Sequence, residues 1–282
     1  MDTDSIFLTL ADIFLLLSPE EKEALSDIQP RIDFLDFFAK EKIQPKIKST
    51  IALIENQLNS FLGFLDMKRE NIGDSVIVTG KKRYIMNVYD SEGVRYQIPK
   101  KKIMGIESVR SSTPPLCRQL IRDTIDFFFT NDNVFLIKII DKCKKKIFQE
   151  KDLSLICFPR GVNGLEKYSD TSKTDAFYTK GTPKHVRGSL VFNKWLKEKK
   201  MESKYTSIQE GEKIKFAYLK MPNPFREDVI AWSSSSPPKE FSLEKYIDLE
   251  QHFQIGYLNP IQKILDAVGW QSEKFEETND WF

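Results

Sequence analysis

The sequence has few of the residue types that build metal centres and disulfide frameworks. Its three cysteines, Cys117, Cys143 and Cys157, are far apart and form no Cys-x-x-Cys pair, and it has only two histidines. This usage favours neither a zinc site nor a disulfide scaffold, and it argues against a histidine-based zinc or iron centre. We therefore expect a protein of a reducing cytoplasm.

Long hydrophobic runs are also missing. No stretch approaches the roughly 20 apolar residues that cross a bilayer, and the run FLLL at 14–17 is far shorter. The N-terminus lacks a basic segment followed by an apolar stretch and a cleavage site, so we expect no secretory signal and no membrane partner. The hydrophobic fraction of 40% and charged fraction of 30% are typical of a soluble globular protein.

No charge of one sign prevails, since 43 Lys and Arg against 41 Asp and Glu give a net charge of +2. The basic residues are nevertheless clustered, at 81–83, 100–102, 144–146 and 197–200. Local basic clusters in a near-neutral chain fit a protein that binds a polyanion. Each run taken alone is better explained as a solvated helix face.

The N-terminal half mixes helical and strand patterns. Residues 5–10 predict a buried strand, and residues 18–25 predict a helix start capped by Ser18. Apolar residues recur at helical spacing from about 31 to 65, with a kink or break at Pro45. Residues 72–107 are rich in β-branched and aromatic residues, and the turn 90–93 predicts a hairpin at about 83–98.

The C-terminal half begins at the boundary SSTPP, 111–115. It predicts a helix with Thr113 as its cap and Pro114 at its first position. Further helices are expected at about 133–148, 242–253 and 259–268, and a strand at 213–220.

The first residues, Asp2-Thr3-Asp4, form a motif that can bind a divalent metal. The motif alone is weak, because short Asp-x-Asp strings occur by chance. Haloacid-dehalogenase-type phosphatases use such a pair at the end of a buried strand, and no strand precedes it here.

The Asp-x-Asp motif gains meaning from other motifs further along the chain. The sequence has DTDS at 2–5, KKRY at 81–84, PKKKIMG at 99–105 and SSTP at 111–114, and later GTPKHVRGSL at 181–190 and NPFREDVIAW at 223–232. In this order they resemble the C-terminal part, palm motif C plus thumb, of a family B DNA polymerase of the T-even-like phage type. The resemblance covers nearly the whole chain.

The resemblance implies an α+β fold. Residues 1–110 would complete a polymerase palm, with antiparallel strands backed by helices. Residues 111–268 would form a mainly helical thumb with a small β element, and residues 269–282 a C-terminal tail.

The resemblance also implies a two-metal Mg²⁺ site for nucleotidyl transfer from a dNTP, and carboxylate oxygens are the ligands that Mg²⁺ prefers. Asp4 would be the metal-bridging carboxylate, and Asp2 a supporting acid near the metal. Glu70 matches a palm acid close to the metals. The family often has Asp two residues before it, where this chain has Lys68.

Nine further residues are implied in contacts with primer-template DNA: Lys81, Lys82, Arg83, Tyr84, Lys100, Lys102, Lys184, His185 and Arg187. Cations beside the minor groove pair with phosphates and read the acceptor atoms that all base pairs share. For the KKRY block the alternative is a basic strand end, and for His185 an ordinary partly buried histidine. The run Lys144 to Lys146 lies outside the matching motifs and is interpreted as a solvated helix face.

The tail ends in Trp281 and Phe282 after an acidic spacer. Phage polymerases of this type end in a short hydrophobic peptide that docks on a sliding clamp, and aromatic anchors dominate small interfaces. Packing of the two rings on their own domain explains the same residues equally well.

Several parts of a family B polymerase are missing from the sequence. We find no motif A aspartate followed by Ser-Leu-Tyr-Pro, no fingers motif B and no exonuclease Asp-x-Glu pattern. We therefore expect activity only with a separate N-terminal polymerase chain, in the cytoplasm of an infected bacterium. The strand 5–10 would be an unpaired edge without it. The alternatives are an inactive truncated remnant and an accessory protein that binds DNA or the clamp.

Overall fold

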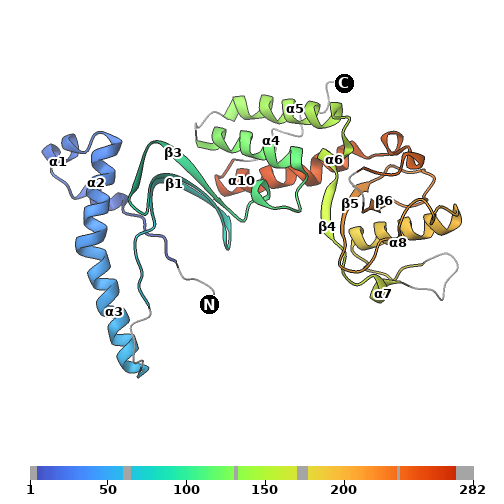
Figure 1. The fold of residues 1–282 in the computed structure, drawn as a ribbon. Helices are drawn as coiled ribbons and strands as arrows, with labels where there is room; N and C mark the ends of the chain where they lie inside the picture. Colours follow the sequence, from blue (N-terminus) through green and yellow to red (C-terminus); the bar gives the residue numbers. More distant parts are fainter. Residues whose placement is uncertain (1–4, 60–64, 130–132, 170–176, 234–235, 271–282) are drawn as a thin grey trace. The chain divides into compact units, whose positions relative to one another are not determined.

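The computed structural model describes residues 5–59, 65–129, 133–169, 177–233 and 236–270 (Figure 1). Helices and two three-stranded sheets make an α+β fold, which confirms the expected class. The chain forms two compact units. The first unit comprises Met1–Val76 and Ile85–Lys102, and the second comprises Ile77–Tyr84 and Ile103–Phe282.

The first unit begins with short helices and continues into long ones. After a 3₁₀ turn at Ala11–Leu15, α1 covers Pro19–Ala24 and α2 covers Ile28–Phe38. The cap predicted at Ser18 is confirmed. The Ser18 hydroxyl accepts from the Glu21 amide at 3.2 Å, and the Glu21 carboxylate accepts from the Ser18 amide at 2.8 Å.

Of the kink or break predicted at Pro45, the break is wrong. A π-helical segment, Ala39–Ile43, joins α2 to α3, Gln44–Gln57, and Pro45 lies in the first turn of α3. Proline lacks an amide proton and its ring clashes with the carbonyl of the preceding turn. The wider π turn opens the hydrogen-bond ladder at that point, so the helical path continues.

The strand predicted at residues 5–10 is also wrong. These residues have no regular structure, and Ile6, Phe7 and Leu8 are each more than half exposed. A strand requires a neighbour that pairs with its amides and carbonyls, and the described part of the chain supplies none there.

One sheet consists of β1, Asn71–Gly80, β2, Arg83–Ser91, and β3, Val94–Met104, in that order. Two-residue connections make it an antiparallel meander. The predicted hairpin is confirmed, since Glu92 and Gly93 have φ of 51° and 90°, as a tight strand connection requires. The Asp90 carboxylate accepts from the Gly93 amide at 3.0 Å and fixes this turn.

Few apolar side chains of the first unit are buried. The buried ones among its described residues are Ile32, Ala39, Ile72, Ile85 and Val88. More than twice as many large apolar side chains are exposed: Ile6, Phe7, Leu8, Leu15, Leu16, Phe37, Leu53, Ile54, Leu58, Leu65, Val76, Val94 and Ile98. Among its described residues, the first unit therefore exposes more large apolar side chains than it buries.

The second unit is mainly helical. Its helices are α4, Pro115–Ile125; α5, Asn133–Gln149; α6, Leu153–Ile156; α7, Leu165–Tyr168; α8, Lys184–Glu198; α9, Leu249–Phe253; and α10, Asn259–Ala267. Short 3₁₀ turns lie at Glu107–Val109, Asp126–Phe129, Lys239–Phe241 and Leu243–Lys245. The helix predicted after SSTPP starts one residue later than expected, because Pro114, not Thr113, is its N-cap.

The single helix predicted at 242–253 is wrong. A 3₁₀ turn is followed by an isolated antiparallel β-bridge between Ile247 and Leu219, and α9 starts only after Asp248. The Asp248 carboxylate accepts from the Gln251 amide at 3.0 Å and caps α9. A π segment, Gln254–Leu258, then joins α9 to α10, the helix predicted at 259–268.

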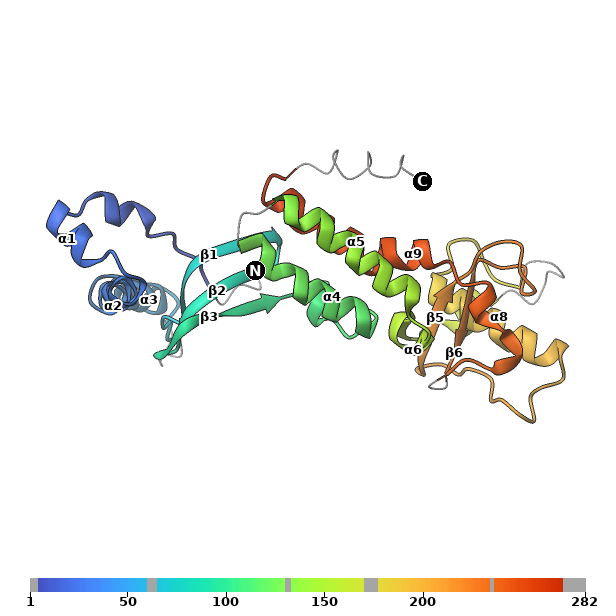
Figure 2. The same ribbon diagram turned by 90° about the horizontal axis from the view of Figure 1, so that it is seen from above.

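The second sheet is antiparallel, with β4, Phe158–Gly161, β5, Lys213–Tyr218, and β6, Val229–Trp232. The strand predicted at 213–220 is thereby confirmed, and α8 packs on β6. Trp232 and Tyr257 are completely buried. Figure 2 shows α4 and α5 side by side, as their packing contacts require. The second unit thus has an apolar core of its own.

Candidate nucleic-acid interface

The expected catalytic acids Asp2 and Asp4 lie outside the described residues. The third, Glu70, directly precedes β1, and its side chain is 58% exposed. Its carboxylate accepts from Lys102 Nζ at 3.2 Å and from Asn71 Nδ2 at 3.4 Å. Among the described residues no three His, Cys, Asp or Glu side chains lie together as a metal site. Glu70 is therefore an accessible oxygen donor with a lysine beside it.

A buried ion cluster lies next to Glu70 in the chain, and the sequence pattern did not predict it. Arg69 bonds to Asp36 of α2 at 2.6 Å and also to Asp90 at the end of β2. Arg95 of β3 lies 2.8 Å from the other oxygen of Asp90, whose side chain is completely buried. Burial opposes ionisation of Asp36, but hydrogen bonds from Lys40 and Arg69 outweigh it and lower its pKa. The cluster ties α2 to the sheet and fixes the residue before Glu70.

Lys100 and Lys102 lie on β3 of the first unit. Because side chains alternate along a strand, the two share one face and Lys101 has the other. Lys100 Nζ lies 4.1 Å from the centre of the Tyr96 ring, and Lys101 Nζ donates to Asn87 Oδ1 at 3.0 Å. Lys100 is exposed, so its charge reaches solvent from this face.

The KKRY block forms the turn between β1 and β2 and the first two residues of β2, in the second unit. Lys81 and Lys82 are exposed in this turn, and Lys82 has a positive φ of 58°. Arg83 is held differently, because its Nη2 donates to both carboxylate oxygens of Glu107 at 2.7 and 2.6 Å. The block therefore combines two solvent-facing cations with one anchored arginine.

Gly105, the last residue of the PKKKIMG motif, lies against the backbone of the KKRY block. Its φ is +65°, and a Cβ at this position would lie 2.3 Å from the Lys82 carbonyl oxygen. Any side chain there would push the turn away, so glycine lets the chain after β3 approach the KKRY turn closely.

The expected contacts Lys184 and Arg187 lie on α8 and are already paired. Lys184 Nζ lies 2.5 Å from Asp228, and Arg187 bonds to the same carboxylate. The segments GTPKHVRGSL and NPFREDVIAW therefore meet in space. Gly188 completes this contact, since a Cβ there would lie 3.1 Å from the Ala231 amide nitrogen. These ion pairs give both cations a structural role.

His185 is half-buried beside the ring of Phe216, with ring centres 6.2 Å apart. Burial, together with the charge of Arg160, lowers the pKa of His185, which favours the neutral form of the ring. A neutral imidazole can donate one hydrogen bond to a phosphate but adds no charge.

A pocket in the second unit contains cations that the sequence analysis did not single out. It has a volume of about 210 Å³, and Arg110 and Arg160 are among the residues that line it. Both arginines are exposed, and the neighbouring Glu107 already pairs with Arg83. The other lining residues are Glu107, Ser112, Thr113, Phe158, Phe216, Tyr218, Ile255 and Gly256. Two arginines in a pocket that is also lined by aromatic side chains suit a phosphate group. Of the motifs found in the sequence, only SSTP contributes residues to this pocket.

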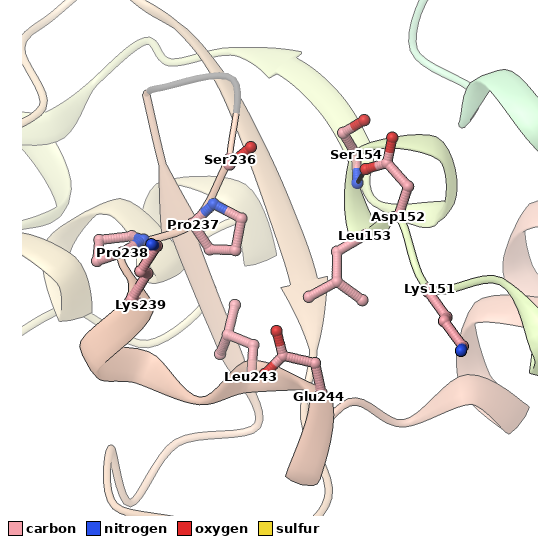
Figure 3. Close-up of a pocket in the computed structure, with 10 residues that line it drawn as sticks. All are labelled: Lys151, Asp152, Leu153, Ser154, Ser236, Pro237, Pro238, Lys239, Leu243 and Glu244. Atoms are coloured by element: carbon pink, nitrogen blue, oxygen red, sulfur yellow. Dashed lines mark hydrogen bonds between the residues drawn. The ribbon is translucent and has the colours of Figure 1, made fainter.

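A second pocket, of about 220 Å³, has mixed charge (Figure 3). Lys151 and Lys239 line it together with Asp152 and Glu244, and Pro237 and Pro238 form one side. The Asp152 carboxylate accepts from the Ser154 amide at 2.8 Å and caps α6. Its acids offset its lysines, so it is the less suitable of the two pockets for a polyanion.

The run 144–146 behaves as a solvated helix face in part. Lys145 and Lys146 are exposed on α5, whereas Lys144 Nζ lies 2.9 Å from a Glu250 carboxylate oxygen. Trp281 and Phe282 lie outside the described residues. None of the described helices is both long and apolar enough to cross a membrane.

Comparison with known proteins gives a consistent result. No family model matches the chain. It is 29% identical to the DNA-directed DNA polymerase of Escherichia phage RB69 over 100% of its length, and 25% identical to that of Enterobacteria phage T4 over 97%. The chain spans about a third of these curated relatives, 31% and 30% of their lengths. From end to end the chain is thus similar to one portion of the T4-like phage DNA-directed DNA polymerases, as expected of the C-terminal part of such an enzyme.

Proposed function

We propose that this chain is the C-terminal palm and thumb portion of a phage DNA-directed DNA polymerase, which binds primer-template DNA and a dNTP in the cytoplasm of the infected host. The observation that carries the proposal is the alignment of essentially the whole chain with two such polymerases. Residues 1–110 belong to the palm in this proposal, residues 111–268 to the thumb, and residues 269–282 to a tail that docks on a sliding clamp through Trp281 and Phe282.

The acids of the palm hold the catalytic metal in this proposal. DNA polymerases need a divalent cation, and the aspartate oxygens of Asp2 and Asp4 are donors that suit Mg²⁺. Bound Mg²⁺ would supply charge stabilisation for the reacting phosphates. The exposed carboxylate of Glu70 fits a supporting acid, and its lysine neighbour limits the negative charge at that point.

DNA binding rests on cations that reach solvent. Lys81 and Lys82 are exposed in a tight turn, and Tyr84 follows them on β2. Arg83 is anchored by Glu107 and sets the direction of the turn. Lys100 and Lys102 bind the primer backbone from β3. Lys184, His185 and Arg187 contribute through α8, where the pairing with Asp228 positions the two cations.

The chain lacks the motif A aspartate and the fingers, so we propose that a separate N-terminal polymerase chain completes the site. The test is reconstitution. The two chains, copurified, should extend a primer in the presence of Mg²⁺, and Asp4→Ala should reduce the rate by at least about a thousandfold, because a metal-bridging carboxylate is lost.

Lys145→Ala is the matched control, since it removes an exposed charge on α5 and should leave extension unchanged. If the wild-type pair associates and binds DNA without extending primers, the chain is an inactive remnant or an accessory protein. Clamp docking is checked separately, by deleting Trp281 and Phe282, which should shorten the products made in one binding event when a clamp is present.

A further inference from the structure

One helix of the first unit has an apolar face that the described residues of the unit cover only in part. Ile47, Ile51, Ile54 and Leu58 follow one another at spacings of four, three and four residues, along α3 and its C-cap. These spacings place the four side chains in one stripe, called the α3 stripe below. Ile47 and Ile51 are partly exposed, Ile54 is 45% exposed and Leu58 73% exposed, and α3 contains no buried residue.

The exposed apolar face of α3 leaves the stability of this helix unexplained. α3 continues the helical path of α2 and the π segment, and most helical stability in proteins comes from packing of an apolar face. Among the described residues, the main contacts of α3 are with the π segment that directly precedes it in the chain. Figure 1 shows its C-terminal end projecting away from the sheet of its unit. The α3 stripe therefore has the composition of a core-facing surface without a core.

We propose that the α3 stripe docks on the two thirds of the polymerase that this chain lacks. This inference rests on the proposed function. The chain accounts for 31% of the length of the RB69 polymerase, so most of such an enzyme lies outside it. The first unit also exposes far more large apolar side chains than it buries, whereas the second unit has a closed core. A missing partner against the first unit accounts for both facts.

The partner surface should be apolar, because the stripe offers methyl groups and no hydrogen-bonding atoms. Contiguous exposed apolar surface marks interaction sites, and truncation of buried anchors dominates the loss of affinity in interfaces. Ile54 and Leu58 are the most exposed members of the stripe, so charges there should harm docking while leaving the fold of the isolated chain intact.

The test uses the full chain with the double substitution Ile54→Glu/Leu58→Glu. The matched control is Ala52→Glu/Asn56→Glu, which adds the same charges at the same spacing on the opposite, exposed face of α3. Binding is measured by surface plasmon resonance against the immobilised N-terminal polymerase chain from the same genome. The stripe variant should bind about a hundredfold more weakly than wild type, and the control should bind as wild type does.

Circular dichroism and the affinity for a primer-template duplex should be unchanged in both variants. If the stripe variant binds the N-terminal chain as tightly as wild type, the inference is overturned while the proposed function stands. If the wild-type chain does not bind at all, the proposed function fails as well. If instead wild type dimerises in sedimentation equilibrium and the stripe variant is monomeric, the occupant is a second copy of the chain and the inference is wrong.

Discussion

The two units of the chain are stabilised in different ways. The second unit encloses an apolar core around side chains such as Trp232, Tyr257 and Ile121, which are completely buried. Few of the first unit's described apolar residues are buried, and an ion cluster joins α2 to the end of β2 through Arg69. An apolar core is stable by itself, whereas a unit joined by ion pairs with open apolar faces depends on what covers it.

Substitution of the buried Asp90 is the strongest way to test this difference. Asp90→Ala removes a completely buried carboxylate from Arg69 and Arg95, which keep their pairs with Asp36, and breaking a buried ion pair costs about 3–5 kcal/mol. The first unit should unfold while the second stays folded. Hydrogen exchange should show loss of protection in β2 and β3.

Tryptophan fluorescence provides the control for this substitution. All four tryptophans of the sequence, Trp195, Trp232, Trp270 and Trp281, fall in the second unit. The fluorescence-detected unfolding midpoint should therefore be that of wild type. A clear shift of this midpoint would show that the second unit is not independently stable.

Acid should weaken the second unit through His252. The Tyr218 amide donates to His252 Nε2 at 3.0 Å, the ring lies 2.9 Å from the Ile156 carbonyl at Nδ1, and the ring is buried. Burial lowers the pKa of His252 to about 4, from 6.5 in the unfolded chain. The unfolded state binds the proton first, so the stabilisation is complete above pH 6.5 and is lost as the pH falls towards 4.

At pH 5 this linkage amounts to about 2 kcal/mol. Urea unfolding followed by tryptophan fluorescence at pH 8 and pH 5 measures it. In His252→Gln, which is less stable at every pH, the difference between the two pH values should shrink by that amount. An unchanged difference would assign the acid sensitivity to other groups.

The smallest expected effect is on DNA affinity, which tests the exposed lysines of the second unit. Lys81 and Lys82 are exposed in the second unit, so Lys81→Ala/Lys82→Ala should weaken binding of a primer-template duplex about tenfold. The slope of log affinity against log salt should fall by about 2, since each lysine releases roughly one counterion. Fluorescence anisotropy over a salt series gives both values.

Lys145→Ala/Lys146→Ala is the matched control, because these lysines are also adjacent, exposed and in the second unit. Equal losses in the two variants would mean that binding follows net charge alone.

Local patterns predicted local structure well. Ser18 with Glu21 three residues later gave a capping box, and the turn 90–93 gave the hairpin between β2 and β3. The predictions failed where a partner distant in the sequence decides the outcome. Residues 5–10 have a strand pattern without a pairing strand, and the β-bridge of Ile247 with Leu219 interrupts the helix predicted at 242–253.

In the candidate site, too, the contiguous motifs were predictable from the sequence and the contacts between distant residues were not. The motifs KKRY, PKKKIMG and SSTP could be recognised from sequence because they are contiguous strings. The ion pairs of the site join residues that are 24 to 44 positions apart, which no periodicity reveals. Arg83 pairs with Glu107, and both Lys184 and Arg187 pair with Asp228. The roles of Asp2, Asp4 and the other site residues in catalysis and DNA binding stay predictions.

The sequence alone determined the α+β class, most element positions and the likeness to a phage DNA polymerase, because these depend on local order and contiguous motifs. Only the tertiary structure decided which cations are exposed and which are paired. It also decided that Asp90 is the buried centre of an ion cluster and that the described residues cover the α3 stripe only in part. The physical reason is that burial and charge pairing depend on which distant residues meet, and that is set by packing rather than by neighbours in the chain.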